Sequence, residues 1–127
     1  MARQVSGLRL INGDAVNDLV DLKSFTATTG LTALAGGGAT GATQLQPGLN
    51  NVTVVATNDD SVILPVAKAG TLVLVVNSDS TQNIKVHAVG SDTINGTAGA
   101  TGVAQSAGIT ALYTCPTDTK WFRLLSA

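Results

Sequence analysis

Few residues of this chain could perform chemistry. The candidates are one histidine, His87, one cysteine, Cys115, and eight acidic residues, all of them aspartates. A zinc site needs three or four ligands drawn from His, Cys, Asp or Glu. Because His87 and Cys115 fall in separate predicted strands, we expect no zinc site. The strand pattern instead predicts that His87 is exposed, or lies at an interface, on the polar side of its strand.

The aspartates and serines do not form a recognisable catalytic pattern. A Ser-His-Asp triad could include His87, but no nucleophile-elbow sequence supports one. Asp59 and Asp60 are adjacent in a predicted turn, where they are expected to stabilise the turn rather than act as a glycosidase pair. The Asp-rich loops lack the spacing of an EF-hand. The sequence therefore predicts no enzyme, no bound metal and no cofactor.

Three of the four aromatic residues lie close together near the C-terminus, namely Tyr113, Trp121 and Phe122. Trp121 or Tyr113 could stack on a sugar, as in lectin-like modules. However, residues 109–125 contain two alternating runs around a Pro-Thr-Asp turn, which predicts a closing β-hairpin. Burial in the core of that hairpin is the expected role of the rings, and Cys115 is expected to be a small buried hydrophobe.

The elements that would position these residues are short strands. Alternating or apolar runs at residues 51–57, 61–64, 71–76 and 83–89 recur at intervals of roughly 8–14 residues, with turn residues between them. Residues 71–76 are apolar almost throughout, as in a strand buried on both faces. The prediction is an all-β fold, a compact antiparallel β-sandwich or barrel of jelly-roll type, with an extended N-terminal arm.

The domain boundary is predicted near residue 45. Residues 1–45 would be the N-terminal arm and a Gly/Ala/Thr-rich linker, which is ordered only by packing against something else, and residues 46–127 the β domain. Asn12-Gly13 favours a turn, after which Asp14 either caps a short helical turn or continues an extended arm. The arm carries spaced apolar residues that could be buried only against a partner: Leu8, Leu10, Ile11, Val16, Leu19, Val20 and Leu22.

Composition limits the partners. Of the 127 residues, only 12% are charged, against about 25% in typical soluble domains. A surface so poor in charge is a weak barrier to association, and a β region of about 80 residues is marginally stable alone, so we expect an assembly. The net charge of −1 argues against nucleic acid as a partner. No apolar run reaches the roughly 18 residues of a membrane span, and no secretory signal is visible at the N-terminus.

Several segments resemble a pattern of small tailed-phage virion proteins, those known as head decoration, cement or head-fibre proteins. The matching segments are Asp92-Thr-Ile-Asn-Gly96, Ala100-Thr-Gly-Val-Ala-Gln105, Leu112-Tyr-Thr-Cys115 with Trp121, Asn51-Val-Thr-Val-Val-Ala-Thr57, Asp60-Ser-Val-Ile-Leu-Pro65 and Gly70-Thr-Leu-Val-Leu-Val-Val-Asn77. The resemblance covers roughly residues 36–125 and carries no catalytic residues.

The resemblance implies a function and a location. The chain would be made in the bacterial host cytoplasm and bind the outer capsid surface of the virion as a homotrimeric decoration protein. Its partner would be the major capsid protein, whose neighbouring subunits it would clamp. The alternatives are a head-fibre, neck or tail appendage module and, in another class, a glycan-binding β module.

Overall fold

The computed structural model describes residues 26–126, and within this range the all-β prediction is confirmed: there are strands and no helix. The strands are β1 (Ala27–Thr32), β2 (Thr43–Gln44), β3 (Gly48–Val54), β4 (Asp60–Ile63), β5 (Leu72–Asn77), β6 (Ile84–His87), β7 (Thr93–Ile94), β8 (Thr97–Ala98), β9 (Val103–Gln105), β10 (Thr110–Thr117) and β11 (Lys120–Leu125).

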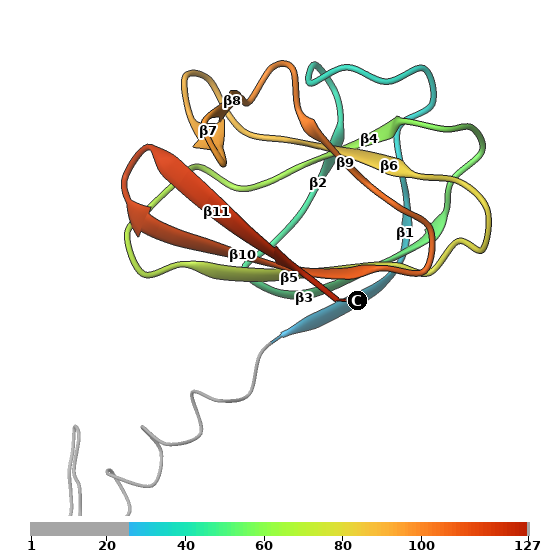
Figure 1. Ribbon diagram of the computed structural model, residues 1–127. Helices are drawn as coiled ribbons and strands as arrows, with labels where there is room; N and C mark the ends of the chain where they lie inside the picture. The colour runs from blue at the N-terminus through green and yellow to red at the C-terminus, as the bar shows by residue number, and fades with distance from the viewer. Residues whose placement is uncertain (1–25, 127) are drawn as a thin grey trace, which may run out of the picture.

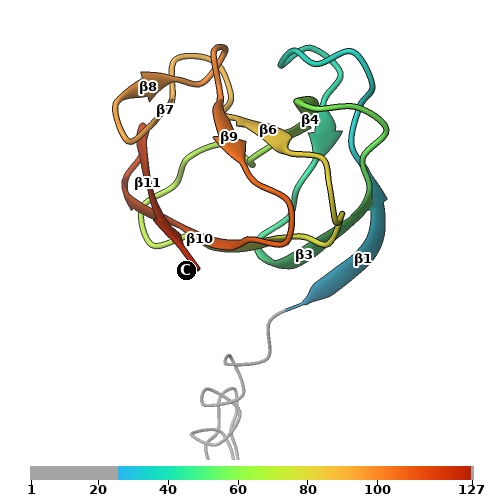
Figure 2. The ribbon, with the colours of Figure 1, turned by 45° about the vertical axis from the view of Figure 1, so that its right-hand side comes forward.

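The strands form two mixed sheets that face each other across the core (Figure 1). One sheet has the order β1-β3-β5-β10-β11-β7-β8, and the other has the order β2-β4-β6-β9. The chain alternates between the sheets from β1 to β6, so that β1, β3 and β5 pair in parallel, as do β2, β4 and β6. Seen from a second side, the chain circles the core, and the fold is a β-solenoid of about 4 turns (Figure 2).

The predicted antiparallel sandwich or barrel was therefore wrong. The strand segments were largely located correctly. However, each of β1 to β4 pairs with the strand two positions further along the chain, because the strand between them belongs to the opposite sheet. Strand spacing is similar for hairpins and for solenoid turns. Since the side-chain period of two is the same for parallel and antiparallel strands, the sequence pattern could not distinguish the two arrangements.

The stretch assigned to the arm and linker supplies the first turn of the solenoid. Residues 27–45 contribute β1 and β2, and Leu45 is fully buried in the core. Within the glycine-rich segment, the backbone N–H of Gly36 donates to Asp60 Oδ1 at 3.3 Å. Packing against the second turn thus orders a segment that buries too little apolar surface to fold alone.

The last strands reverse direction and close the fold. Strand β9 runs antiparallel to β6, and β10 runs antiparallel to β5. Strands β10 and β11 form the closing hairpin, which confirms the prediction for residues 109–125. The predicted tight turn at residues 92–96 joins β7 to β8, with Asn95 at φ 50° and Gly96 at φ 83°, as a two-residue hairpin turn requires.

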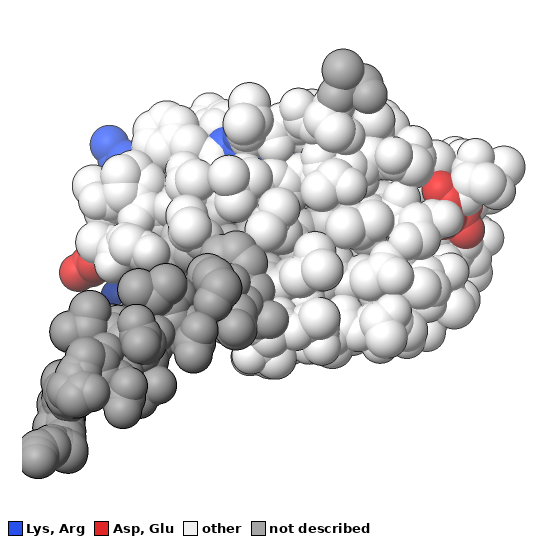
Figure 3. Space-filling view, turned by 90° about the horizontal axis from the view of Figure 1, so that it is seen from below, with Lys and Arg blue, Asp and Glu red and all other residues white. Residues whose placement is uncertain are grey.

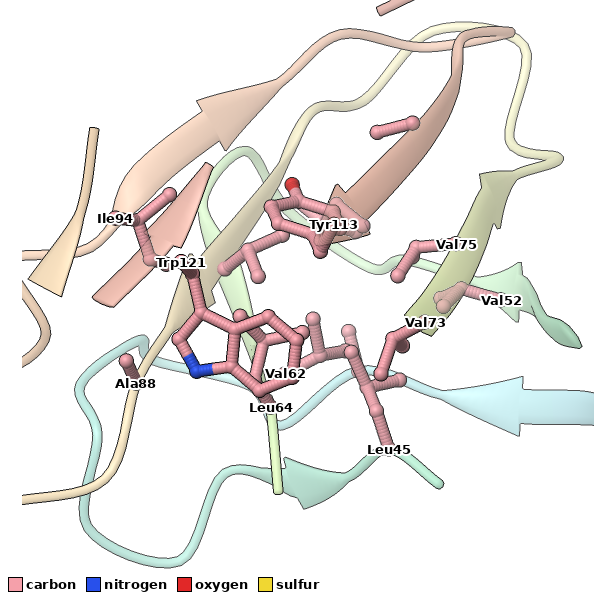
Figure 4. Close-up of a cluster of buried hydrophobic side chains, with 14 of the residues drawn as sticks. Leu45, Val52, Val62, Leu64, Val73, Val75, Ala88, Ile94, Tyr113 and Trp121 are labelled. Atoms are coloured by element: carbon pink, nitrogen blue, oxygen red, sulfur yellow. The ribbon is translucent and has the colours of Figure 1, made fainter. Parts of the chain in front are cut away.

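The core between the sheets is made of aliphatic side chains around two aromatic rings. Trp121 and Tyr113 are fully buried among residues such as Leu45, Val62 and Leu64 (Figure 4). The predicted burial of Trp121, Tyr113 and Cys115 is confirmed, but for Phe122 it was wrong, because this ring alternates with Trp121 on β11 and is 48% exposed on the outer side of the sheet. Trp121, on β11, fixes the last strand of the hairpin onto the core that the solenoid turns enclose.

Candidate interaction surface

Among the residues that the structure describes, one serine–histidine pair could suggest catalysis, and it joins two neighbouring strands. Ser61 of β4 and His87 of β6 place Oγ and Nε2 3.2 Å apart, and His87 Nδ1 lies 3.1 Å from the backbone carbonyl oxygen of Gly99. The third group is thus a carbonyl and not a carboxylate. Ser61 and His87 are 0% and 2% exposed, so a substrate cannot reach them in this conformation. The pair serves to hold the two strands and the Gly99 loop together.

The prediction that His87 is exposed or at an interface was wrong. His87 alternates with the core residues Ile84 and Val86 as the strand pattern predicted, but residues 99–102 fold over the ring. A Cβ atom added at Gly102 would lie 2.9 Å from His87 Nδ1, which shows how closely this loop covers it. The cover comes from the segment just before β9, whose Val103 pairs with Val86 of β6. This segment is distant from His87 in the sequence, so the alternation within β6 does not reveal it.

Most of the aspartates that the structure describes accept hydrogen bonds from backbone groups. Asp60 accepts hydrogen bonds from the backbone N–H groups of Ala56 and Thr57 at 2.9 and 3.0 Å and from the Thr57 hydroxyl at 2.7 Å, which confirms the predicted stabilisation of this turn. Burial alone would raise the pKa of Asp60, but the bonds from Thr57, Ala56 and Gly36 outweigh it and hold the pKa below 3.8. Between residues 26 and 126, no three His, Cys, Asp or Glu side chains are grouped as a metal site.

The aromatic side chains proposed for sugar stacking are not displayed. Trp121 and Tyr113 both have 0% exposure, and the Tyr113 hydroxyl donates to Gln105 Oε1 at 3.0 Å in the interior. Of the three aromatic rings in the closing hairpin, only Phe122 is exposed, at 48%. Since a stacking platform needs an open ring face, the hairpin offers Phe122 alone.

The surface that does stand out is the outer side of the seven-stranded sheet. On β3, β5, β10 and β11, residues alternate between the core and this side, and the outward residues fall into cross-strand rows. One row, which we call the leucine row, is set by the pairs Leu49–Leu74, Leu74–Leu112 and Leu112–Leu124. Together with its flanking residues it forms the apolar outer face: Leu49, Leu72, Leu74, Val76, Leu112, Phe122 and Leu124.

No charged residue occupies an outward position on the three central strands β3, β5 and β10. Their polar outward residues are Asn51, Thr53, Thr110 and Thr114. Figure 3 views this side of the molecule, where most of the described surface is white and the few acidic and basic atoms visible lie mainly toward its edges. Leu72, Phe122 and Leu124 are 40%, 48% and 69% exposed.

Such a face is unusual for a sheet exposed to water. A sheet with one solvated side normally alternates apolar and polar residues, whereas strands that are apolar on both sides are normally covered on both. The sequence of β5 predicted a strand buried on both faces. Its outward residues Leu72, Leu74 and Val76 are instead partly open in the described part of the molecule. Contiguous exposed apolar surface of this kind typically marks an interaction site.

The predicted partner-binding residues, Leu8, Leu10, Ile11, Val16, Leu19, Val20 and Leu22, all lie outside the residues that the structure describes. The apolar outer face was not predicted from the sequence. Its signal was present in the uninterrupted apolar run of β5, which was interpreted as a central strand rather than as a surface.

No protein-family model matches the chain, and no curated protein matches it significantly. Across residues 26–126, there is no helix of the length and apolar character needed to cross a membrane.

Proposed function

We propose that this protein is a structural virion component that binds the outside of a phage capsid as a decoration, or cement, protein. It would clamp neighbouring major capsid subunits and act as a homotrimer at the capsid surface, without catalysis. The resemblance of residues 36–125 to small virion proteins supports this proposal, and so does the charge-poor composition. The observation that carries it is the apolar outer face, which is suited to burial against another protein.

The proposed mechanism is mass action. A ligand that binds the assembled shell, and not its separated subunits, stabilises the shell by the free energy of binding. Each Leu or Val side chain transferred from water into such a contact contributes roughly 1.5–3 kcal/mol before ordering costs. The apolar residues of the arm and of the outer face would both supply such contacts.

The test is a capsid-binding assay with purified shells. Deletion of residues 1–25 and, separately, Leu112→Lys on the leucine row should each weaken occupancy, because one removes the arm and the other places a charge in an apolar contact. Val66→Lys is the matched control, since Val66 is 66% exposed but lies outside the apolar outer face. Equal occupancy by all variants would remove both surfaces from the mechanism.

A second candidate function stays within the virion, as a head-fibre, neck or tail appendage. The same apolar face would suit that role, and copy number in purified particles separates the two: many copies cover a shell and few form an appendage. A glycan-binding role has less support, because both rings proposed for stacking are buried.

A further inference from the structure

The apolar outer face borders the point at which the N-terminal segment joins the fold. Strand β1 is an edge strand of the seven-stranded sheet, and its Ala27 pairs with Leu49 at the end of the leucine row. We propose that residues 8–22 of the same chain pack on the apolar outer face and cover it in the free protein. This inference does not rest on the proposed function.

The segment has the reach to do so. Leu22 precedes Ala27 by a stretch of chain that spans at most about 17 Å when extended. Neighbouring strands lie about 4.8 Å apart, so the path from β1 to β11 across the leucine row is about 19 Å. Residues 8–22 can therefore lie over the centre of the face without displacing any described strand.

The segment also has matching chemistry. Its apolar residues Val16, Leu19 and Val20 follow a helical spacing, which leaves Asn17, Asp18 and Asp21 on the opposite side. An extended arm would likewise present apolar residues at intervals. In either conformation, the apolar side would meet central strands whose outward positions carry no charge, with Lys120 at the margin on β11, and the aspartates could remain in water. The apolar outer face would then be buried as the sequence of β5 predicts.

The same chain is favoured over another copy as the source of the segment because of the short connection. A tether of a few residues gives an effective concentration in the millimolar range, above ordinary protein concentrations in solution. Closing a loop of this length also costs little entropy beyond a constant. If the arm engages a capsid as proposed above, it must leave this face, which then becomes a second apolar contact.

Cysteine labelling of the purified protein tests the proposal. In a Cys115→Ala background, Leu74→Cys places one thiol at the centre of the face. Its reaction with a maleimide should be about tenfold slower in the full chain than after deletion of residues 1–25, because only the uncovered fraction of molecules reacts. Val66→Cys is the control thiol, and its rate should not change on deletion.

A substitution set serves in case the deleted protein aggregates. The triple variant Val16→Ser, Leu19→Ser and Val20→Ser should accelerate labelling at position 74 as the deletion does. The matched variant Asn17→Ser, Asp18→Ser and Asp21→Ser changes the same number of neighbouring positions on the polar side and should leave the rate low.

Three results would overturn the proposal. Equal labelling at position 74 with and without the segment shows that the face is open. If labelling at position 74 slows as the protein concentration is raised, if this slowing remains after deletion of residues 1–25, and if an oligomer is seen in sedimentation, the face is covered by a second copy. Equal acceleration by both triple variants denies a specific packing surface. All these measurements use protein without capsids, so failure to bind capsids while the protection persists would count against the proposed function alone.

Discussion

At the scale of single residues, Gln105 is the polar centre of the interior. Its side-chain amide donates to the backbone carbonyl oxygens of Val75 and Ile109 at 2.9 and 2.8 Å, and its carbonyl oxygen accepts the Tyr113 hydroxyl. One fully buried side chain thereby connects β9, β5 and β10. Buried polar groups stabilise a fold only when all their partners are present, so this network is sensitive to single substitutions.

Tyr113→Phe tests the network and gives a pH signature. Removal of the hydroxyl leaves Gln105 Oε1 without its donor and should cost about 1–2 kcal/mol of unfolding free energy at neutral pH. Burial raises the pKa of Tyr113 to about 12, partly offset by Arg123. The unfolded chain loses this proton near 10, so Tyr113 should reduce stability as the pH rises from 10 toward 12.

Urea unfolding at several alkaline pH values measures this effect. The free energy of unfolding of the wild type should fall more steeply with pH than that of Tyr113→Phe. Both proteins contain the same lysines, so the contribution of the lysines cancels in this comparison. Identical slopes would show that the hydroxyl titrates alike in the folded and unfolded chains.

Gly102 provides a second test at this scale. It has φ +71°, and a Cβ there would meet His87 Nδ1 and the Val86 carbonyl oxygen, both at 2.9 Å. Gly108 has nearly the same φ, +72°, with no atom within 4 Å of its added Cβ. Gly108→Ala should cost about 1–2 kcal/mol for the left-handed backbone, and Gly102→Ala clearly more, because the loop must also move off His87. Equal losses of stability for Gly102→Ala and Gly108→Ala in thermal unfolding would show that the loop at residues 99–102 can move away from His87 without cost.

At the scale of elements, Asp60 joins two consecutive turns of the solenoid. It begins β4, receives the donors of the β3–β4 corner and also accepts the N–H of Gly36 from the preceding turn. Because these bonds hold its pKa below 3.8, the stability it contributes is complete well above this value and is lost as the pH falls through the folded pKa.

Asp60→Asn should therefore destabilise the protein by about 2 kcal/mol at neutral pH and flatten the loss of stability in acid. In the asparagine variant, an NH2 group replaces one of the two carboxylate oxygens, so that a donor group faces the N–H and O–H donors that this oxygen accepted from. Asp59→Asn is the control, since Asp59 is partly exposed and its ion pair with Lys85, at 3.8 Å, contributes little. Chemical denaturation at neutral and acidic pH measures both variants, and equal acid sensitivity of Asp60→Asn and wild type would contradict this role.

The elements also show how much the sequence could predict. Local patterns located the strands β3 to β6 and the closing hairpin, because alternation and turn residues are properties of neighbouring positions. The direction of pairing was missed, since the partner of β3 is β5 and nothing in either segment specifies a parallel neighbour. The apolar outer face was missed for a related reason: an apolar run shows that both sides of a strand avoid water, but not whether the fold itself covers both.

At the scale of the whole molecule, the parallel strands of the solenoid and the antiparallel strands that close it share one sheet and one core. The C-terminal strand β10 lies between β5, from the solenoid, and its hairpin partner β11, while Gln105 bonds to β5 across the interior. No turn of the solenoid can lose its neighbours without exposing the common core. We therefore expect one cooperative transition rather than the stepwise unfolding of long repeat arrays.

Coincidence of two probes tests this expectation. Trp121, the only tryptophan, reports on the last strand, whereas far-ultraviolet circular dichroism reports on all the strands. Their urea transitions should superimpose. Loss of the Trp121 signal at lower urea would show that the closing hairpin detaches from a solenoid that remains folded.

The reversal at β10 has a consequence for how copies can stack. Of the strands at the sheet margins, β8 and β2 have two residues each and β9 has three, whereas β1 has six. Within residues 26–126, β1 pairs only with β3, so it offers the one long backbone edge. Fibres grow when each copy presents two complementary edges, one to accept the previous copy and one to receive the next. The described residues offer a single such edge, so we expect backbone pairing between two copies of residues 26–126 to end at a closed pair rather than propagate into a filament.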